Sequence, residues 1–335
     1  MTRSFRRLLV AGGAGFIGSN FVRLLRATRP DVNITVLDAL TYAGNPANLS
    51  GLDVELVHAS IADRPLVMSL AKDVDAIVNF AAMTHVDRSV TDPLEFVRTN
   101  VEGTAVLCEA ARQHDHKVFL QVSTDEVYGH VPEGRSRESD ALRPRSPYSA
   151  SKAGGEMIAR AYAETYGLPV LITRGSNTYG QFQYPEKLIP VLVTNAIDDQ
   201  KLPLYNDGSA VRDFVHVEDH CRAIDLVLHD APADGVYNIG TGAETSGKQV
   251  AEAVLDIMAK PHDLIEYVAD RPGHDYRYAL DISRITELGW EPRVSFSEGL
   301  DRTVRWYQEH QDWWRPLKSG EYWEYYRQNY RPLER

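Results

Sequence analysis

The glycine-rich segment GGAGFIG at residues 12–18 constrains the fold more than any other feature of this chain. It directly follows the apolar run at residues 8–11, so the sequence predicts a buried strand, a tight turn and the start of a helix. Glycines at Gly12, Gly15 and Gly18 let backbone N–H groups at a helix N-terminus approach a pyrophosphate. Asp38 ends the second apolar run, where a carboxylate can accept hydrogen bonds from ribose hydroxyls. We therefore predict a dinucleotide site that prefers NAD to NADP, because a 2′-phosphate would meet the negative charge of Asp38.

Short β-branched runs alternate with amphipathic stretches through the first half of the chain. Strands are predicted at residues 8–11, 34–38, 54–58, 76–80, 118–123, 170–174 and 236–239, and helices at 21–27, 94–113, 147–166 and 189–197. This alternation is typical of βαβ units around a parallel sheet that is buried on both faces. We predict an α/β doubly wound, parallel-sheet Rossmann fold over residues 1–174, joined by the strand near 236–239. Residues 175–335 are predicted to form mainly a smaller C-terminal substrate-binding lobe.

Composition limits the classes of partner. The chain has 36 Lys and Arg against 47 Asp and Glu, and its net charge of −11 makes nucleic acid a poor default partner. No apolar run approaches the length of a membrane span, and the arginines before residue 8 precede an apolar run too short for a signal peptide. Cys108 and Cys221 lie far apart, which suits the reducing cytoplasm. The eleven histidines show no ligand-like spacing, so we predict no metal site.

A tyrosine and a lysine stand four residues apart on a predicted helix. Ser146 is a good N-cap and Pro147 a good first residue, so Tyr148 and Lys152 share one helical face. A tyrosine that acts as a base near pH 7 needs its pKa lowered by roughly three units, which corresponds to about 4 kcal/mol. Lys152, together with an oxidised nicotinamide ring, is a plausible source of the positive charge that this shift requires.

The segment STDEVYG at residues 123–129 ends the predicted fifth strand and places Asp125 and Glu126 side by side at the carboxyl edge of the sheet. With the glycine turn, Asp38 and YSASK at residues 148–152, it resembles the extended short-chain dehydrogenase/reductase superfamily. Within it the chain resembles the nucleoside-diphosphate-hexose 4,6-dehydratases, and among these the dTDP-glucose 4,6-dehydratases. The likeness runs along the whole chain, with LTYAGN at 40–45, HVDRS at 85–89, PEKLIP at 185–190, LPLY at 202–205, RDFVHVEDH at 212–220, RPGHD at 271–275 and an aromatic C-terminus.

The resemblance implies a lyase that uses NAD catalytically in deoxysugar biosynthesis. Tyr148 would take the proton of the C4 hydroxyl while hydride leaves C4, and Thr124 would hydrogen-bond the C4 oxygen. Glu126 would remove the C5 proton, and Asp125, kept protonated by its carboxylate neighbour, would donate to the departing C6 hydroxyl. Hydride then returns to C6. The net reaction is dehydration of a nucleoside-diphosphate hexose, dTDP-glucose above all, to the 4-keto-6-deoxy sugar, with Lys152 completing the catalytic set.

The resemblance also implies two sets of binding residues. Those expected at NAD are Gly12, Gly15, Phe16, Ile17, Gly18, Asp38, Leu40, Thr41, Ser60, Ile61, Phe80, Ala81, Ala82, Thr84, Thr99, Ser123, Tyr148 and Lys152. Those expected at the sugar nucleotide are His85, Thr124, Asn177, Lys187, Leu188, Pro203, Tyr205, Arg212, Asn238, Arg271 and His274. Arginine suits this second set because a planar guanidinium binds a diphosphate through two hydrogen bonds.

The chain departs from the family pattern around the binding sites. Ser60 stands where the family usually has an aspartate near the adenine, Met83 replaces a glutamate, Thr178 replaces an asparagine and Asn206 a glycine. The catalytic residues are intact, which predicts unchanged chemistry with altered binding. Losing a charged hydrogen bond at Ser60 would weaken NAD retention by about 1.5 to 3 kcal/mol.

Two other functions stay open from the sequence. A 4-epimerase or a decarboxylase of the same superfamily would keep the glycine turn and the YxxxK pair but would not need adjacent Asp and Glu. A non-catalytic NAD-binding module would not need the catalytic set. We also expect a homodimer formed through the helices at 94–113 and 147–166, as the family implies, and an aromatic C-terminus that packs on the body of the protein.

Overall fold

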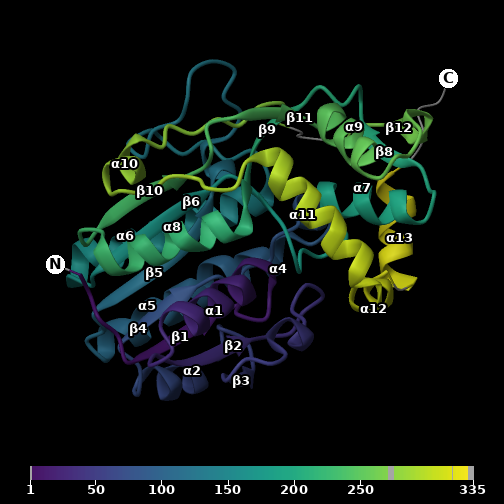
Figure 1. The fold of residues 1–335 in the computed structure, drawn as a ribbon. Helices are drawn as coiled ribbons and strands as arrows, with labels where there is room; N and C mark the ends of the chain where they lie inside the picture. Colours follow the sequence, from purple (N-terminus) through teal and green to yellow (C-terminus); the bar gives the residue numbers. More distant parts are fainter. Residues whose placement is uncertain (1, 271–274, 319, 331–335) are drawn as a thin grey trace.

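The computed structural model describes residues 2–270, 275–318 and 320–330. A seven-stranded sheet forms its centre, with helices on both faces (Figure 1). All neighbouring strands in this sheet are parallel, which confirms the predicted doubly wound fold. In spatial order the strands are β10 (Gly235–Ile239), β6 (Val170–Gly175), β5 (Val118–Thr124), β4 (Ala76–Asn79), β1 (Arg7–Ala11), β2 (Asn33–Asp38) and β3 (Glu55–His58).

Successive side chains of each strand point to opposite faces of the sheet and pack into two separate hydrophobic cores. In β1, Leu8 and Val10 point to one face of the sheet, whereas Leu9 and Ala11 point to the other. The first core packs against α1 (Phe16–Thr28) and α8 (Val217–Asp230). The second packs against α2 (Arg64–Ala71), α5 (Thr104–Gln113) and α6 (Pro147–Tyr166). Because both faces are covered, the strands are almost uniformly apolar.

Local signals explain α6, the helix that carries the YxxxK pair. The Ser146 hydroxyl accepts from the Ser149 backbone N–H, the Ser149 side chain accepts from the Ser146 N–H, and Pro147 is the first helical residue. Gly167 ends the helix in the left-handed conformation with φ 68°. The predicted bounds 147–166 are confirmed.

The helix predicted at residues 94–113 is present as one unbroken helical stretch over residues 93–113, but its middle is not α-helical. The structure has α4 (Pro93–Val97), a π-helical segment (Arg98–Gly103) and then α5. The Asn100 side-chain amide in this segment donates to the Met83 carbonyl and to the Ser151 hydroxyl, and its oxygen accepts from the Met83 N–H. These tertiary hydrogen bonds stabilise the wider π-helical turn, which the hydrophobic periodicity of the sequence does not predict.

A second lobe covers the carboxyl ends of the strands (Figure 1). It contains a three-stranded sheet, β11 (Glu244–Ser246), β9 (Val211–His216) and β7 (Asn177–Tyr179), and a pair, β12 (Ile265–Val268) and β8 (Leu202–Tyr205). Its core lies between α7 (Leu188–Ile197), α9 (Gly247–Ile257) and α11 (Phe296–Glu309). The remaining elements across the whole described chain are η1 (Pro46–Leu49), α3 (Val86–Thr91), η3 (Asp125–Tyr128), η4 (His262–Leu264), α10 (Ser283–Glu287), α12 (Gln311–Trp314), η5 (Arg315–Leu317) and α13 (Gly320–Asn329).

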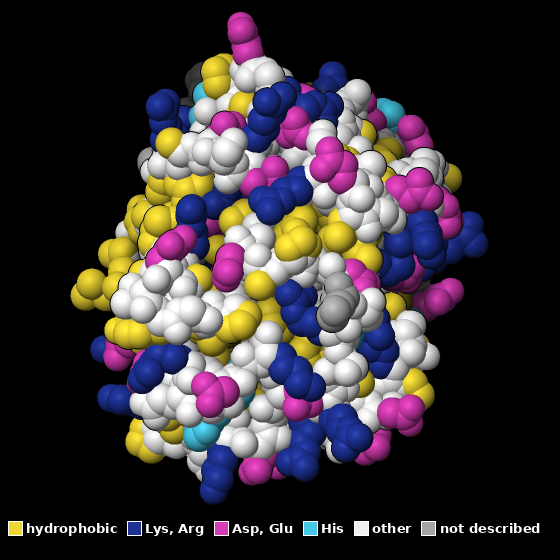
Figure 2. Space-filling view, turned by 90° about the vertical axis from the view of Figure 1, so that its left-hand side faces the viewer, with side chains coloured by type: hydrophobic (Ala, Val, Ile, Leu, Met, Phe, Trp, Pro, Cys, Tyr) yellow, Lys and Arg dark blue, Asp and Glu magenta, His cyan; other side chains and the backbone are white. Residues whose placement is uncertain are grey.

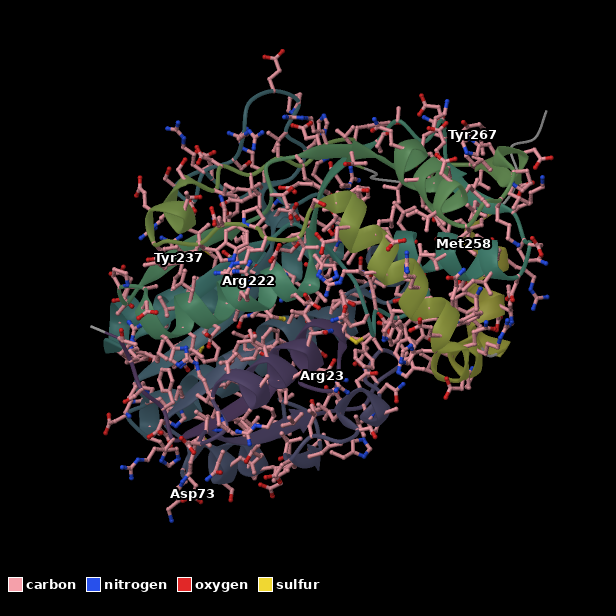
Figure 3. All side chains as sticks on the ribbon, in the orientation of Figure 1. Arg23, Asp73, Arg222, Tyr237, Met258 and Tyr267 are labelled. Atoms are coloured by element: carbon pink, nitrogen blue, oxygen red, sulfur yellow. The ribbon has the colours of Figure 1, made fainter. Side chains whose placement is uncertain are left out.

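The C-terminal aromatic residues pack on the body of the protein, as predicted, and they also contact both lobes. Trp314 is fully buried in the core of the second lobe, and Tyr322 is 2% exposed. The Trp313 indole N–H donates to the Asn48 side chain of the first lobe at 2.9 Å. Arg23 of α1 donates to the Asn48 carbonyl and stacks on the Phe182 ring, at the junction visible in Figure 3. Within the described ranges, no helix has the length and apolarity needed to cross a membrane.

Candidate active site

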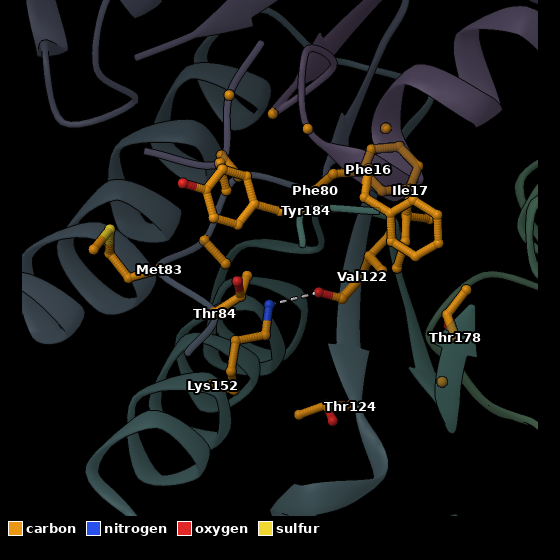
Figure 4. Close-up of a pocket in the computed structure, with 18 of the residues that line it drawn as sticks. Phe16, Ile17, Phe80, Met83, Thr84, Val122, Thr124, Lys152, Thr178 and Tyr184 are labelled. Carbon is orange, nitrogen blue, oxygen red and sulfur yellow. Dashed lines mark hydrogen bonds between the residues drawn. The ribbon is translucent and has the colours of Figure 1, made fainter. Parts of the chain in front are cut away.

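A long cavity runs along the carboxyl ends of β1, β2, β4, β5 and β6. The glycine turn, Asp38 and Ser60 line one end of it, and Glu126, Tyr148 and Lys187 line the other. Figure 4 shows part of its wall, with Phe16 and Ile17 of α1 on one side and Lys152 of α6 on another. The crossover connections bring these side chains together, because the carboxyl ends of parallel strands meet at one edge of the sheet.

The glycine turn forms a cradle that side chains would fill. Gly12 has φ 76°, and a Cβ atom there would lie 2.4 Å from the backbone nitrogen of Ala81. A Cβ atom on Gly18 would lie 2.2 Å from the carbonyl oxygen of Gly12. The first turn of α1 contains no acidic residue that would compete with a phosphate for its backbone N–H groups. These features fit the pyrophosphate of a dinucleotide.

Asp38 is held by backbone donors at the other edge of the turn. Its carboxylate accepts from the Ala14 N–H and the Leu40 N–H, each at 2.9 Å, while burial raises its pKa. Leu40 itself does not line the cavity, although we expected it to contact the cofactor. Its side chain packs against the hydrophobic core, and its backbone, at φ 49°, serves to fix Asp38. The next residue, Thr41, lines the cavity as expected.

The remaining residues expected at the cofactor all line this cavity. They are Gly15, Ser60, Ile61, Phe80, Ala81, Ala82, Thr84, Thr99 and Ser123, together with Phe16, Ile17 and the glycines already described. The Ser60 hydroxyl accepts from the Ala62 N–H at 3.1 Å, so the serine closes a local turn and presents no charge to the cavity.

The five expected catalytic residues also meet at one end of the cavity. Thr124 ends β5, and its hydroxyl caps the Glu126 N–H at 3.3 Å and donates to Asp125 at 3.2 Å. Asp125 is 3% exposed, and its Oδ2 has no hydrogen-bond partner among the described residues. Burial, and then the negative charge of Glu126, raise the pKa of Asp125 to about 8. The carboxyl group is therefore mostly protonated at neutral pH.

The pKa of Tyr148 in the YxxxK pair is raised, whereas we expected Lys152 and the cofactor to lower it. Burial and the charge of Glu126 raise the pKa of Tyr148 well above its usual value, opposed by a hydrogen bond with Thr124. Lys152 donates to the Val122 carbonyl at 2.8 Å, and burial lowers the pKa of its ammonium to about 8 (Figure 4). Lys152 is thus directed at the end of β5, and Tyr148 is a neutral phenol at pH 7.

A second cavity adjoins the first, with Glu126, Asn177 and Lys187 in the walls of both. Its other walls include the expected substrate residues His85, Leu188, Pro203, Tyr205 and Arg212. The Arg212 guanidinium donates to the carbonyl oxygens of Val211, Asp275 and Tyr276, and it stacks on the Tyr278 ring. A molecule that spans both cavities would thus pass directly over Glu126.

Among the described residues, one expected substrate residue, Asn238, does not line either cavity. Asn238 is fully buried outside both walls. Its amide donates to the carbonyl oxygens of Ser136 and Asp281, and its Oδ1 accepts from the Tyr128 hydroxyl, so its capacity is used by the fold. The expectation for Asn238 is therefore corrected to a structural role. Arg271 and His274 lie outside the described residues.

Several residues in the walls had no role assigned from the sequence. Thr178 and His220 face the first cavity, Glu186 lies in the walls of both, and Phe214 and Tyr330 line the second. His220 lies in the family motif RDFVHVEDH and Glu186 in PEKLIP, so membership of these motifs could have indicated that both residues lie at the site. Across the part of the chain that the structure describes, there is no group of three His, Cys, Asp or Glu residues suited to a metal.

Fold and site together define a dinucleotide-binding α/β protein with a buried aspartate next to a partly exposed glutamate at the cavity. Residues 9–303 match the family model described as GDP-mannose 4,6 dehydratase, and the chain belongs to this family. It is 50% identical over 322 residues to a dTDP-glucose 4,6-dehydratase from Streptomyces niveus, a match that covers 93% of this chain and 96% of that protein.

Solved structures of a dehydratase and of an epimerase share the fold of this chain. The structure of the dTDP-glucose 4,6-dehydratase DesIV from Streptomyces venezuelae, with NAD bound, superposes with a TM-score of 0.91 at 51% identity. It covers 93% of this chain and 100% of that one. A UDP-glucose 4-epimerase from Thermus thermophilus, in complex with NAD, superposes with a TM-score of 0.85 at 33% identity, over 91% of this chain and 99% of that one.

Proposed function

We propose that the protein is an NAD-dependent dehydratase that converts dTDP-glucose to dTDP-4-keto-6-deoxyglucose. The observation that carries the proposal is the Asp125–Glu126 pair at the junction of the two cavities. One member lines both cavities, and the other is kept protonated near neutral pH by its burial and by its neighbour. An elimination needs a base and an acid in this arrangement.

NAD fits the first cavity. The glycine cradle suits its pyrophosphate, Asp38 suits the adenosine ribose, and the buried Ser123 hydroxyl and His220 Nε2 have no partners among the described residues. NAD, when bound, accepts a hydride from C4 of the sugar and later returns it to C6. Its oxidised ring would also supply positive charge in the cavity that Tyr148 lines.

The side chains of this protein then have separate roles. Tyr148 takes the proton from the C4 hydroxyl as the hydride leaves, and Thr124 holds the C4 oxygen. The resulting ketone acidifies the C5 hydrogen, which Glu126 removes as a proton. Asp125 donates its proton to the C6 hydroxyl, and water departs. Lys152, which donates to the Val122 carbonyl, would hold the cofactor ribose and would support the charge on Tyr148.

The sugar nucleotide fits the second cavity. Lys187 and Arg212 supply positive charge for the diphosphate, and Tyr205 offers an aromatic face to the base. His85, Asn177, Leu188 and Pro203 complete the proposed contacts, as do Arg271 and His274 from outside the described residues.

A product assay tests the function. The protein is incubated with NAD and dTDP-glucose, and proton NMR should show the new C6 methyl signal of a 4-keto-6-deoxy sugar. The same reaction with UDP-glucose and GDP-mannose measures nucleotide preference. A 4-epimerised sugar would show that the structural similarity to epimerases reflects activity, and an unchanged sugar would favour a binding module. Either outcome would refute the dehydratase proposal.

We infer a homodimer that forms through α4 and α6. Leu94 is 75% exposed, and Val97 and Met157 are about half exposed although all three are large and apolar. Figure 2 shows hydrophobic side chains gathered along the left-hand edge of that view, which belongs to the rear face of Figure 1, where α5 and α6 lie. A second copy would cover this surface. We place the protein in the cytoplasm because both cysteines are buried and free.

A further inference from the structure

His220 of α8 is a buried histidine in the wall of the first cavity that the reaction described above does not use. It is 1% exposed, and its ring packs on the end of β6, where a Cβ atom on Gly175 would lie 2.4 Å from His220 Cε1. Gly175 pairs in register with Thr124 of β5. The ring therefore lies beside the strand end that carries the catalytic threonine.

The hydrogen bonds of Thr178 determine which nitrogen of His220 carries the proton. The Thr178 hydroxyl donates to the Ser176 carbonyl at 3.2 Å, and its oxygen lies 2.7 Å from His220 Nδ1. A hydroxyl has one proton, and with that proton given to the Ser176 carbonyl, Nδ1 is assigned as the donor in this second bond. Burial lowers the pKa of His220 to about 4, and the ring is neutral at pH 7. Its Nε2 is consequently an unprotonated acceptor.

This acceptor has no donor in the part of the chain that the structure describes. A buried acceptor without a partner is costly, so the site is built for a donor that arrives with a ligand. The nearby Ser123 and Ser176 hydroxyls also lack partners within the described residues. In Figure 4, Thr178 and Lys152 lie on either side of Val122, so Thr178, the partner of His220, lines the cavity on the side opposite Lys152.

We propose that His220 Nε2 accepts a hydrogen bond from the carboxamide NH2 group of the nicotinamide ring, and that Thr178 holds His220 in the tautomer this bond requires. The inference rests on the proposed use of NAD. The redox ring must lie at the end of β5, within reach of a sugar held by Thr124 and Tyr148, and its carboxamide is the one part of the ring that carries N–H donors. His220 is thus a positioning residue that fixes which face of the ring meets the sugar.

A binding cycle tests the proposal. The protein stripped of dinucleotide is titrated by calorimetry with NAD and with 3-acetylpyridine adenine dinucleotide, in which a methyl group replaces the NH2 group. The wild type should prefer NAD, and His220→Phe should reduce the ratio of the two dissociation constants about tenfold. Thr178→Val, which removes the partner of Nδ1 with little change of volume, should reduce the same ratio. The matched control is His229→Phe in the same helix, which should leave it unchanged.

Each outcome has a distinct meaning. If the wild type binds NAD and the ratio stays the same in folded His220→Phe and Thr178→Val proteins, the assignment of His220 is refuted while the proposed function stands. If the wild type binds neither dinucleotide, the proposed function fails. Thermal unfolding of each variant establishes that it is folded, and Thr178→Val keeps the test decisive if His220→Phe does not fold.

Discussion

The buried ion pair between Arg174 of β6 and Glu156 of α6 offers a quantitative test of how the site is held together. Both side chains are fully buried, and the guanidinium donates to the carboxylate at 2.7 and 3.0 Å. Arg174 also donates to the Tyr128 hydroxyl at 2.7 Å. Glu156 stands one helical turn after Lys152, and Tyr128 ends the short helix that begins at Asp125. The pair thus joins the two elements that carry the catalytic residues.

The two partners should differ in their response to removal. Arg174→Met leaves a carboxylate buried without its cation, and we expect the free energy of unfolding to fall by about 3 to 5 kcal/mol. Glu156→Leu should cost less, because Arg174 retains the Tyr128 hydroxyl and the Glu138 carbonyl as acceptors. The double variant removes both charges at similar volume, so we expect it to recover most of the loss.

Urea unfolding followed by tryptophan fluorescence and by circular dichroism measures these differences. The matched control is the exposed pair Arg98 and Glu95, with side chains 65% and 47% exposed, whose equivalent substitutions should each change stability by less than about 1 kcal/mol. If the double Arg174→Met and Glu156→Leu variant were destabilised by the sum of the single losses, the argument from unpaired buried charge would be wrong.

Four further predictions concern the site and the dimer. Asp125→Asn should slow water loss about 10²- to 10⁴-fold while oxidation at C4 continues, so NADH absorbance should accumulate in the presence of dTDP-glucose; unimpaired methyl formation would contradict the acid role. Because the pKa of Asp125 is raised to about 8, its proton is present below that value and lost above it, so turnover should fall above pH 8, and stability should also decline as pH rises from about 4 to 8; a rise in turnover across pH 8 to 9 would oppose this assignment. Ser60→Asp should increase NAD affinity by about 1.5 to 3 kcal/mol, as measured by calorimetry with Ser50→Asp as the control, and unchanged retention would separate Ser60 from cofactor binding. Leu94→Glu should shift the protein from dimer to monomer in sedimentation experiments, whereas a dimer of undiminished affinity would place the interface elsewhere.

The parts of the fold that depend on local pattern could be predicted from the sequence. The glycine turn, Asp38 and the bounds of α6 follow from spacing, capping and strand ends, and the structure contains each of them. Local pattern could not predict the π-helical segment, because Asn100 reaches residues far away in the sequence.

The assignment of Asn238 failed for a related reason. A strand at the edge of a predicted sheet gives no information on which loops its polar side chain will bond, and here those loops use the whole amide. His220 was overlooked because its tautomer depends on Thr178, forty-two residues earlier in the chain. Such pairings depend on tertiary structure and have no counterpart in periodicity.

The path of the chain through the two lobes has a consequence for engineering. After β6 the chain enters the second lobe, returns as α8 to pack beside α1, and supplies β10 as the last strand of the central sheet before it leaves again. A truncated piece that ends at residue 174 would therefore expose the flank of β6 and the apolar face of α1. Exchange of substrate specificity with a relative should accordingly succeed through loop grafts at several separate points, and a single crossover between two parent genes should yield insoluble hybrids.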